Sequence, residues 1–227
     1  MQAIVLRRYR KSFGSLFVVT TISLLALGLF LVMAALTAMA IAKTYNRLVA
    51  MKNQTENGFN QINIQLQRRH DLIPNLVTCV GQYMSHEKEA LEAVIAARNQ
   101  ASGQLKGAAA GPGNAAAMSS IAGAESALTG ALGRLSFVME AYPELKADAT
   151  VASLTEELTS TENRISFARQ AYNDWATAFN STRQSFPTIT FADKIGFADD
   201  FSLLEFDEEA IKNVPQVSFS RQEEVAV

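Results

Sequence analysis

The sequence has few of the residues that build metal sites or disulfide frameworks. Among 227 residues there is one cysteine, Cys79, and there are two histidines, His70 and His86. A single thiol excludes a disulfide within the chain and a thiolate metal cluster, and the histidines lack the spacing of paired metal ligands. We therefore expect no metal and no cofactor, and we interpret Cys79 as a small core residue.

The sequence also lacks the short motifs of common enzyme classes. It contains no GxSxG, no GxxxxGK[ST], no GxGxxG and no HExxH. The remaining acid–base candidate is His86 with Glu87, with His70 as a third member, in a membrane hydrolase. Glu87 falls on the apolar stripe of a predicted helix, so we favour a structural role. The sequence predicts a protein that is not an enzyme.

Acidic residues are absent from the first 42 positions. Four of the 20 basic residues lie within 1–11, so residues 43–227 carry the other 16 against all 22 acidic residues. An acidic domain is a poor ligand for nucleic acid, because binding to the phosphate backbone depends on basic side chains. We expect no nucleic-acid partner.

Charge of either sign is missing from residues 12–42, a run of 31 residues. Roughly 20 apolar residues suffice to cross a bilayer. A cleaved signal peptide is the alternative, since Ala38-Met39-Ala40 resembles a cleavage site, but its apolar region would span only about 7–15 residues. We predict a single-pass transmembrane helix over 12–42 in the cell (inner) membrane. The basic arm, 1–11, favours a cytoplasmic N-terminus and an extracytoplasmic C-terminal domain.

Small residues recur along the second half of this span. Ala34, Ala38 and Ala42 are four residues apart, a spacing that allows close contact between helices in lipid. The spacing favours a homo-oligomer.

Apolar periodicity continues beyond the span without a Gly or Pro break. It predicts one helix over about 16–69, which would be on the order of 80 Å long at ~1.5 Å per residue. The polar stretch that follows is interpreted as a corner, at which Asp71 caps a second helix over about 72–106 and Pro74 lies in its first turn.

Two more helices follow a loop at 106–117 that contains Gly111-Pro112-Gly113. The stripe of the third runs over 121–139. The stripe of the fourth runs over 151–179; this helix begins with a capping box, Ser153-Leu-Thr-Glu156, and stops near Phe186-Pro187. Short connections imply antiparallel neighbours. The fold class is thus all-α, with the transmembrane helix continuing into an up-and-down four-helix bundle over 43–186.

Charged residues interrupt the apolar stripes of these helices. Buried carboxylates need partners, and a layer of Arg–Glu pairs specifies which helices face one another at little net gain in stability. The predicted members of this polar core are Arg69, Asp71, Glu87, Arg98, Glu125, Glu162, Arg164 and Arg169.

The remaining segment, 187–227, has no helical period and mixes aromatic with acidic residues. Leaving aromatic side chains in water forgoes roughly 1.5–3 kcal/mol each, so we expect an extended tail that docks on its own bundle or on a neighbouring subunit. The predicted docking residues are Phe191, Phe197, Phe201, Phe206 and Phe219.

Several ordered segments together resemble one family of proteins. They span nearly all of 45–219 and read Tyr45-Asn46, QLQRRHDLIPNLV (65–77), HEKEALEAVIAAR (86–98), AYPELKA (141–147), EELTSTENRISFARQAYND (156–174), Phe186-Pro187, Gly196-Phe197 and Pro215-Gln-Val-Ser-Phe219. On these segments the chain is similar to the LemA family. The resemblance implies an N-terminal single-span anchor, a four-helix bundle and no established enzymatic activity. Because some relatives belong to magnetosome membranes, it also implies a role in organising membrane or recruiting partners.

Two functions are consistent with these features. One is a non-enzymatic scaffold that associates with itself in the lipid bilayer through the alanine face and the aromatic tail. The other is a membrane-tethered sensor or adaptor whose bundle binds a ligand or a membrane protein partner.

Overall fold

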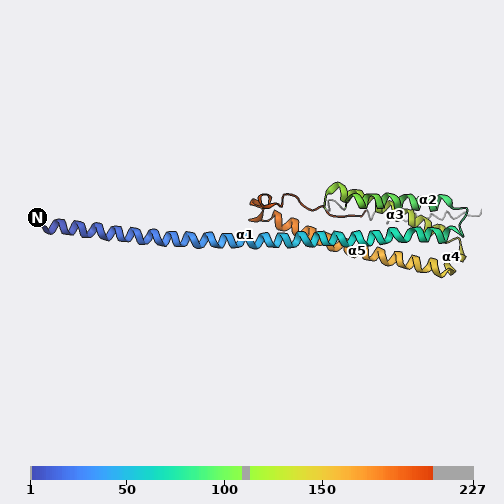
Figure 1. Cartoon of the computed structure of the whole chain (residues 1–227), viewed down its shortest axis with the longest axis horizontal. Coiled ribbons are helices and arrows are strands. Elements are labelled where there is room, and N and C mark those ends of the chain that lie inside the picture. The colour runs from blue at the N-terminus through green and yellow to red at the C-terminus, as the bar shows by residue number, and fades with distance from the viewer. Residues whose placement is uncertain (1, 109–112, 207–227) are drawn as a thin grey trace, which may run out of the picture. The chain divides into compact units, whose positions relative to one another are not determined.

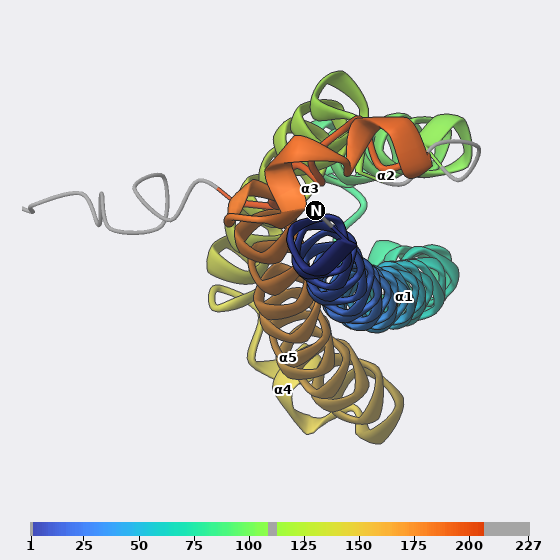
Figure 2. The ribbon, with the colours of Figure 1, turned by 90° about the vertical axis from the view of Figure 1, so that its left-hand side faces the viewer.

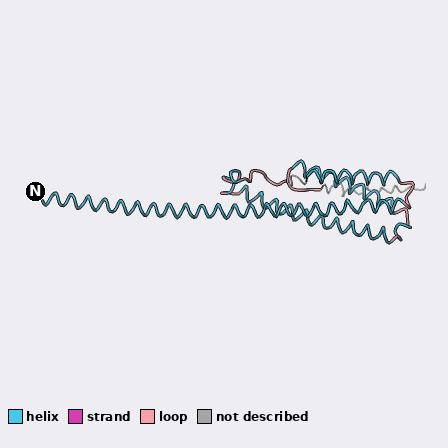
Figure 3. The backbone as a smooth tube through the Cα atoms, in the orientation of Figure 1, coloured by secondary structure: helices cyan, strands magenta, loops and turns pink. Residues whose placement is uncertain are grey.

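The computed structural model describes residues 2–108 and 113–206, with side chains from Thr20 onward. The predicted all-α class is confirmed: the described part is helical with connecting loops and contains no strand (Figure 3). The elements are α1 (Gln2–Gly81), α2 (Lys88–Ala108), α3 (Ala115–Met139), α4 (Pro143–Ala147), α5 (Ala149–Gln184) and two short 3₁₀ helices, η1 (Thr188–Thr190) and η2 (Asp193–Ile195).

Residues 1–49 and 50–227 form two separate units. In the first, α1 contains an 18-residue window of mean hydropathy 2.6, none of it buried. The helix is long and apolar enough to cross a membrane, which fits an anchor or a signal sequence. Ala34, Ala38 and Ala42 are exposed along it.

In the second unit, α2, α3 and α5 lie alongside the part of α1 after residue 50, and successive long helices run in opposite directions (Figures 1 and 2). One buried cluster joins all of these helices and α4, with Ile73, Val80, Val94, Leu128, Leu135, Leu145 and Val151 among its members. A second joins Phe59, Ile62, Leu66, Leu105, Ile121, Ile165, Tyr172 and Leu204. The up-and-down bundle is therefore present, with the short α4 before its last helix.

The predicted corner at Arg68 to Asp71 is wrong, and so is the start of the second helix at residue 72. α1 continues to Gly81, the chain reverses at 82–87, and α2 begins at Lys88. The buried stripe continues past the polar residues through Ile73 and Val80, so ending the helix earlier would expose core side chains.

Pro74 is accommodated inside α1 by a contact from another helix. A proline has no N–H, so the carbonyl four residues earlier, that of His70, lacks its helical partner. The Arg98 Nε on α2 donates to this oxygen at 2.9 Å. The backbone acceptor that Pro74 leaves without a partner is thus satisfied by a side chain.

The predicted capping box at Ser153 is wrong, because α5 begins one turn earlier. Asp148 is its N-cap, and its carboxylate accepts from the backbone N–H of Thr150 at 2.8 Å and of Val151 at 3.1 Å. The bond from Val151, followed by the bond that the Tyr83 O–H donates at 3.0 Å and then that from Thr150, holds the pKa of Asp148 below its usual value. Val151 is buried, so the earlier start places a core residue in the helix.

Candidate functional site

Three buried side chains form a charged network between α1 and α3. The Nη1 of Arg69 lies 3.3 Å from one Glu125 oxygen, and the Nε2 of His70 lies 2.7 Å from the other. The exposed fractions of the Arg69 and Glu125 side chains are 5% and 2%. Both oxygens of a buried carboxylate therefore have partners on one neighbouring helix.

The same arginine extends the network to α5. Its Nη1 lies 3.0 Å from Glu162, whose side chain is 47% exposed, and its Nη2 donates to Thr129 Oγ1 at 2.9 Å. Arg69 thus contacts α3 and α5 from α1. A shift of either helix along its axis would leave a buried charge without its partner, which is costly in the bundle interior.

The other predicted members of the polar core lie nearer to solvent. Asp71 is wrong as a core residue: its side chain is 60% exposed and lies 3.8 Å from Arg98. Arg164 is also exposed. Glu87 is half-buried at the turn after α1, where Tyr142 O–H donates to it at 3.5 Å.

The two histidines are not brought together. His70 is buried and binds Glu125, while His86 is exposed in the turn between α1 and α2. Eleven residues of helix, about 16 Å at 1.5 Å per residue, separate His70 from the end of α1.

The aromatic segment docks on its own bundle. The rings of Phe197 and Phe201 meet the α5 residue Phe179 edge-on, with centroids 5.9 and 5.1 Å away. Phe206 lies under the guanidinium of Arg169, 4.8 Å from ring centroid to Cζ. Phe191, just before η2, is half-buried, and Phe219 lies outside the described residues. The extended form predicted for the tail is wrong at η1 and η2.

Two asparagines of α5 hold the docked segment, residues 201–204, by its backbone. The Asn180 side chain donates to the Phe201 carbonyl at 2.8 Å and accepts from the Phe201 N–H at 2.9 Å. Asn173 does the same for Leu204, at 3.1 and 2.9 Å. Each amide thus pairs with both polar backbone groups of one residue, as a neighbouring strand would.

Two further hydrogen bonds complete this arrangement. The Tyr172 O–H donates to the Ser202 carbonyl at 2.6 Å, and the Ser202 N–H donates to the Gly113 carbonyl at 3.0 Å. Burial raises the pKa of Tyr172 to about 12, so this hydroxyl stays protonated at physiological pH. Gly113 has a φ of 94°, and a Cβ there would lie 2.4 Å from the Phe201 ring. A side chain at this position would strain the backbone, because φ is positive, and would force the Phe201 ring to move.

The comparison with known families agrees with this architecture. The model of the LemA family matches residues 58–219, most of the chain. The chain belongs to the LemA family. A comparison with curated proteins finds no match.

The segment that matches the LemA model contains both the charged network and the asparagine pair. Arg69 and Glu125 are charged residues on otherwise apolar helix stripes, and this pattern identifies them in the sequence. Asn173 and Asn180 were missed. The only signal for them is their spacing of seven on one helix, which places both on the same side of α5.

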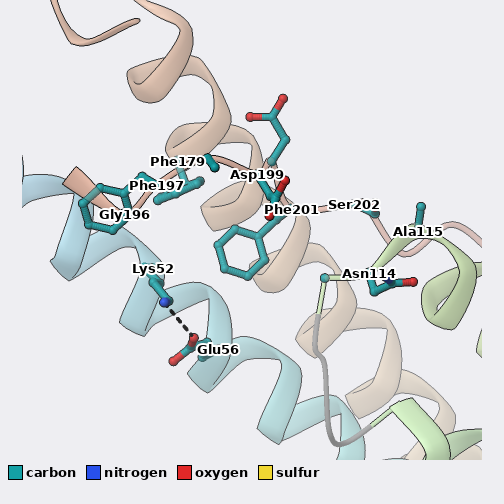
Figure 4. A pocket seen from close by; sticks show the side chains of 13 residues that line it. Lys52, Glu56, Asn114, Ala115, Phe179, Gly196, Phe197, Asp199, Phe201 and Ser202 are labelled. Carbon is teal, nitrogen blue, oxygen red and sulfur yellow. Dashed lines mark ion pairs between the residues drawn. The ribbon is translucent and has the colours of Figure 1, made fainter. Parts of the chain in front are cut away.

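Beside the docked segment, this LemA-family chain has an open cleft of about 640 Å³ (Figure 4). Its walls carry the Lys52–Glu56 ion pair, at 4.0 Å, and the carboxylate of Asp199. Among the described residues no group of three or more His, Cys, Asp or Glu side chains is placed to hold a metal ion. Cys79 is half-buried against the first core cluster.

Proposed function

We propose that this LemA-family protein is a non-enzymatic, single-pass membrane scaffold that associates with itself through its apolar helix. The observation that carries the proposal is the face formed by Ala34, Ala38 and Ala42, which is exposed along an apolar part of α1. In lipid, small residues spaced by four let two helix backbones approach closely, and packing then replaces the hydrophobic effect as the driving force.

The bundle supports a structural role in this proposal. His70, the buried member of the predicted acid–base set, already binds Glu125, and His86 is exposed in the turn before α2. The proposal places the 1–11 arm in the cytoplasm and the bundle outside the cell membrane, because the basic residues that precede the span favour the inner side.

The test is the particle mass of the full-length protein in mild detergent, measured by light scattering and single-particle imaging. We expect a closed particle of several subunits. Ala38→Leu places a large side chain on the alanine face and should lower the subunit number, because the backbones can no longer approach closely.

Ala40→Leu is the matched control. It makes the same change in the same span, but at about 100° per residue it lies roughly 160° from the centre of the alanine face. A wild-type protein that is a monodisperse monomer would overturn the scaffold. Equal loss of subunits in both variants would overturn the assignment of the face.

A membrane-tethered adaptor is a second candidate, favoured by two aromatic side chains without cover. Phe137 on α3 and Phe167 on α5 are 76% and 74% exposed, and an apolar patch that includes such a side chain would mark an interaction surface. A photo-crosslinking residue at position 137 in intact membranes should then form an adduct with a different membrane protein. Adducts only with other copies of this chain would favour the scaffold.

A further inference from the structure

We propose that the face of α5 carrying Asn173 and Asn180 is a binding site for an extended peptide backbone. In the membrane assembly, its occupant is the docked segment, 201–204, of a second copy, so that neighbouring subunits exchange these segments. The inference rests on the self-association proposed above and adds the contact by which the bundles join.

The spacing of the two asparagines matches an extended chain. Seven residues of helix rise about 10.5 Å, and the three steps from Phe201 to Leu204 cover about 9–10 Å when the backbone is extended. Both amides therefore reach a residue of the segment without bending it. A repeat of three residues on one side is that of polyproline II, so the site favours a backbone of this kind that runs antiparallel to α5.

Most of the polar contacts do not depend on the side chains of the occupant. Asn173, Asn180 and the Tyr172 hydroxyl all bind backbone N–H or C=O groups of the segment. Side-chain selection comes from Leu204, which is fully buried, and from the edge-on contact of Phe201 with Phe179. The site thus selects an extended segment with an aromatic residue and, three positions later, a leucine.

A second copy of this chain meets these requirements, because it carries the same segment with Phe201 and Leu204. Exchange recreates the amide, hydroxyl and apolar contacts between chains. The balance between the closed and the exchanged form then depends on the local concentration of copies, which anchoring in one membrane raises.

The chain around the segment allows the exchange. Residues 198–200 are all exposed, and three extended residues span about 10 Å. A pivot there leaves the buried Phe197 in place. It breaks the bonds of Arg183 to the Ala198 carbonyl, at 2.7 Å, and to Asp200, at 2.9 Å, and the bond that Gln184 donates to Asp200, at 2.7 Å. The reach of the pivot requires that the two bundles lie close together.

Photo-crosslinking between two differently tagged full-length copies in the same membranes tests the exchange. The donor copy carries a benzophenone amino acid at Leu203, which is 40% exposed and lies inside the docked segment. Its own site is weakened by Asn173→Ala and Asn180→Ala, whereas the acceptor copy keeps both asparagines. We expect a cross-linked product that contains both tags, with the adduct on α5 of the acceptor.

The acceptor variants test the site itself. Because each asparagine makes two hydrogen bonds, Asn173→Ala with Asn180→Ala in the acceptor should lower the yield by at least about fivefold. The matched control, Asn163→Ala, removes an exposed asparagine from the same helix and should leave the yield unchanged. If the double variant does not fold, as judged by far-UV circular dichroism, each single variant should still lower the yield.

Three results would overturn the inference. The first is adducts found only within the donor chain. The second is a cross-linked product between copies whose yield is unchanged by Asn173→Ala and Asn180→Ala in the acceptor. The third is a yield that Asn163→Ala lowers as much as the asparagine variants do. The particle mass separates this failure from that of the proposed function. A large particle with adducts only within chains leaves the scaffold standing and removes the exchange, whereas a monomer removes both.

Discussion

Removal of the Glu125 carboxylate should destabilise the bundle more than any change at an exposed ion pair. Within 20–108 and 113–206, Glu125→Ala takes one of the two acidic partners from Arg69 and the only hydrogen-bond partner of the His70 Nε2. Breaking a buried pair from one side costs about 3–5 kcal/mol, because the remaining charge stays buried. Glu162 still lies 3.0 Å from Arg69, so we expect the lower end of this range.

A cost of about 3 kcal/mol is large for a domain whose total stability is on the order of 5–15 kcal/mol. The assay is urea unfolding of the full-length protein in mild detergent, followed by far-UV circular dichroism. With a slope of about 2 kcal/mol/M, the midpoint should fall by about 1.5 M.

Glu157→Ala is the matched control. Glu157 pairs with Arg68, the residue next to Arg69, but its side chain is 38% exposed, and such pairs contribute about 0–1 kcal/mol. A midpoint shift for Glu125→Ala no larger than that for Glu157→Ala would refute the reasoning. Combining Glu125→Leu with Arg69→Met should recover much of the loss, since apolar replacement of a buried ion pair is often neutral.

Two other predictions concern backbone groups that side chains satisfy. Arg98→Ala leaves the His70 carbonyl without a partner and should lower the free energy of unfolding, measured by urea unfolding, by about 1–3 kcal/mol. In a Pro74→Ala background the N–H of residue 74 can bind this carbonyl in place of the guanidinium. There, Arg98→Ala should lower the free energy of unfolding by less than half as much. Burial raises the pKa of Tyr172 to about 12, so the contribution of this hydroxyl to stability is complete below pH 10 and is lost as the pH rises to 12. Thermal unfolding measured from pH 8 to 12 should show this loss in the wild type and not in Tyr172→Phe. Equal dependence of the unfolding temperature on pH in the two proteins would contradict the prediction.

Apolar periodicity predicted α3 and α5 well, because their buried residues recur at three and four. It failed near Pro74, where charge and proline together resemble the boundary between two helices. What allows the helix to continue is a hydrogen bond from Arg98, which lies 28 residues away from His70 in the chain. A contact of that kind leaves no local pattern in the sequence.

Some residues of the candidate sites could likewise be predicted from the sequence, and others could not. A charged residue on an apolar stripe is visible in the sequence, which is why Arg69 and Glu125 were expected in the core. Asn173 and Asn180 were not expected, because their partners are backbone atoms of residues 201 and 204. Every residue except proline carries both a backbone N–H and a C=O, so no residue type identifies the partner.

The sequence by itself determined the all-α class, the apolar helix with its alanine face, the absence of a disulfide within the chain and the residues available for a polar core. These follow from residue counts and from periodicity within single segments, which can be read without knowing any contact between distant residues. Only the tertiary structure decided where α1 ends, which carboxylate pairs with Arg69 and His70, and that the aromatic segment lies on α5. Those choices depend on hydrogen bonds and ion pairs between residues distant in the chain, whose strength depends on distance and burial.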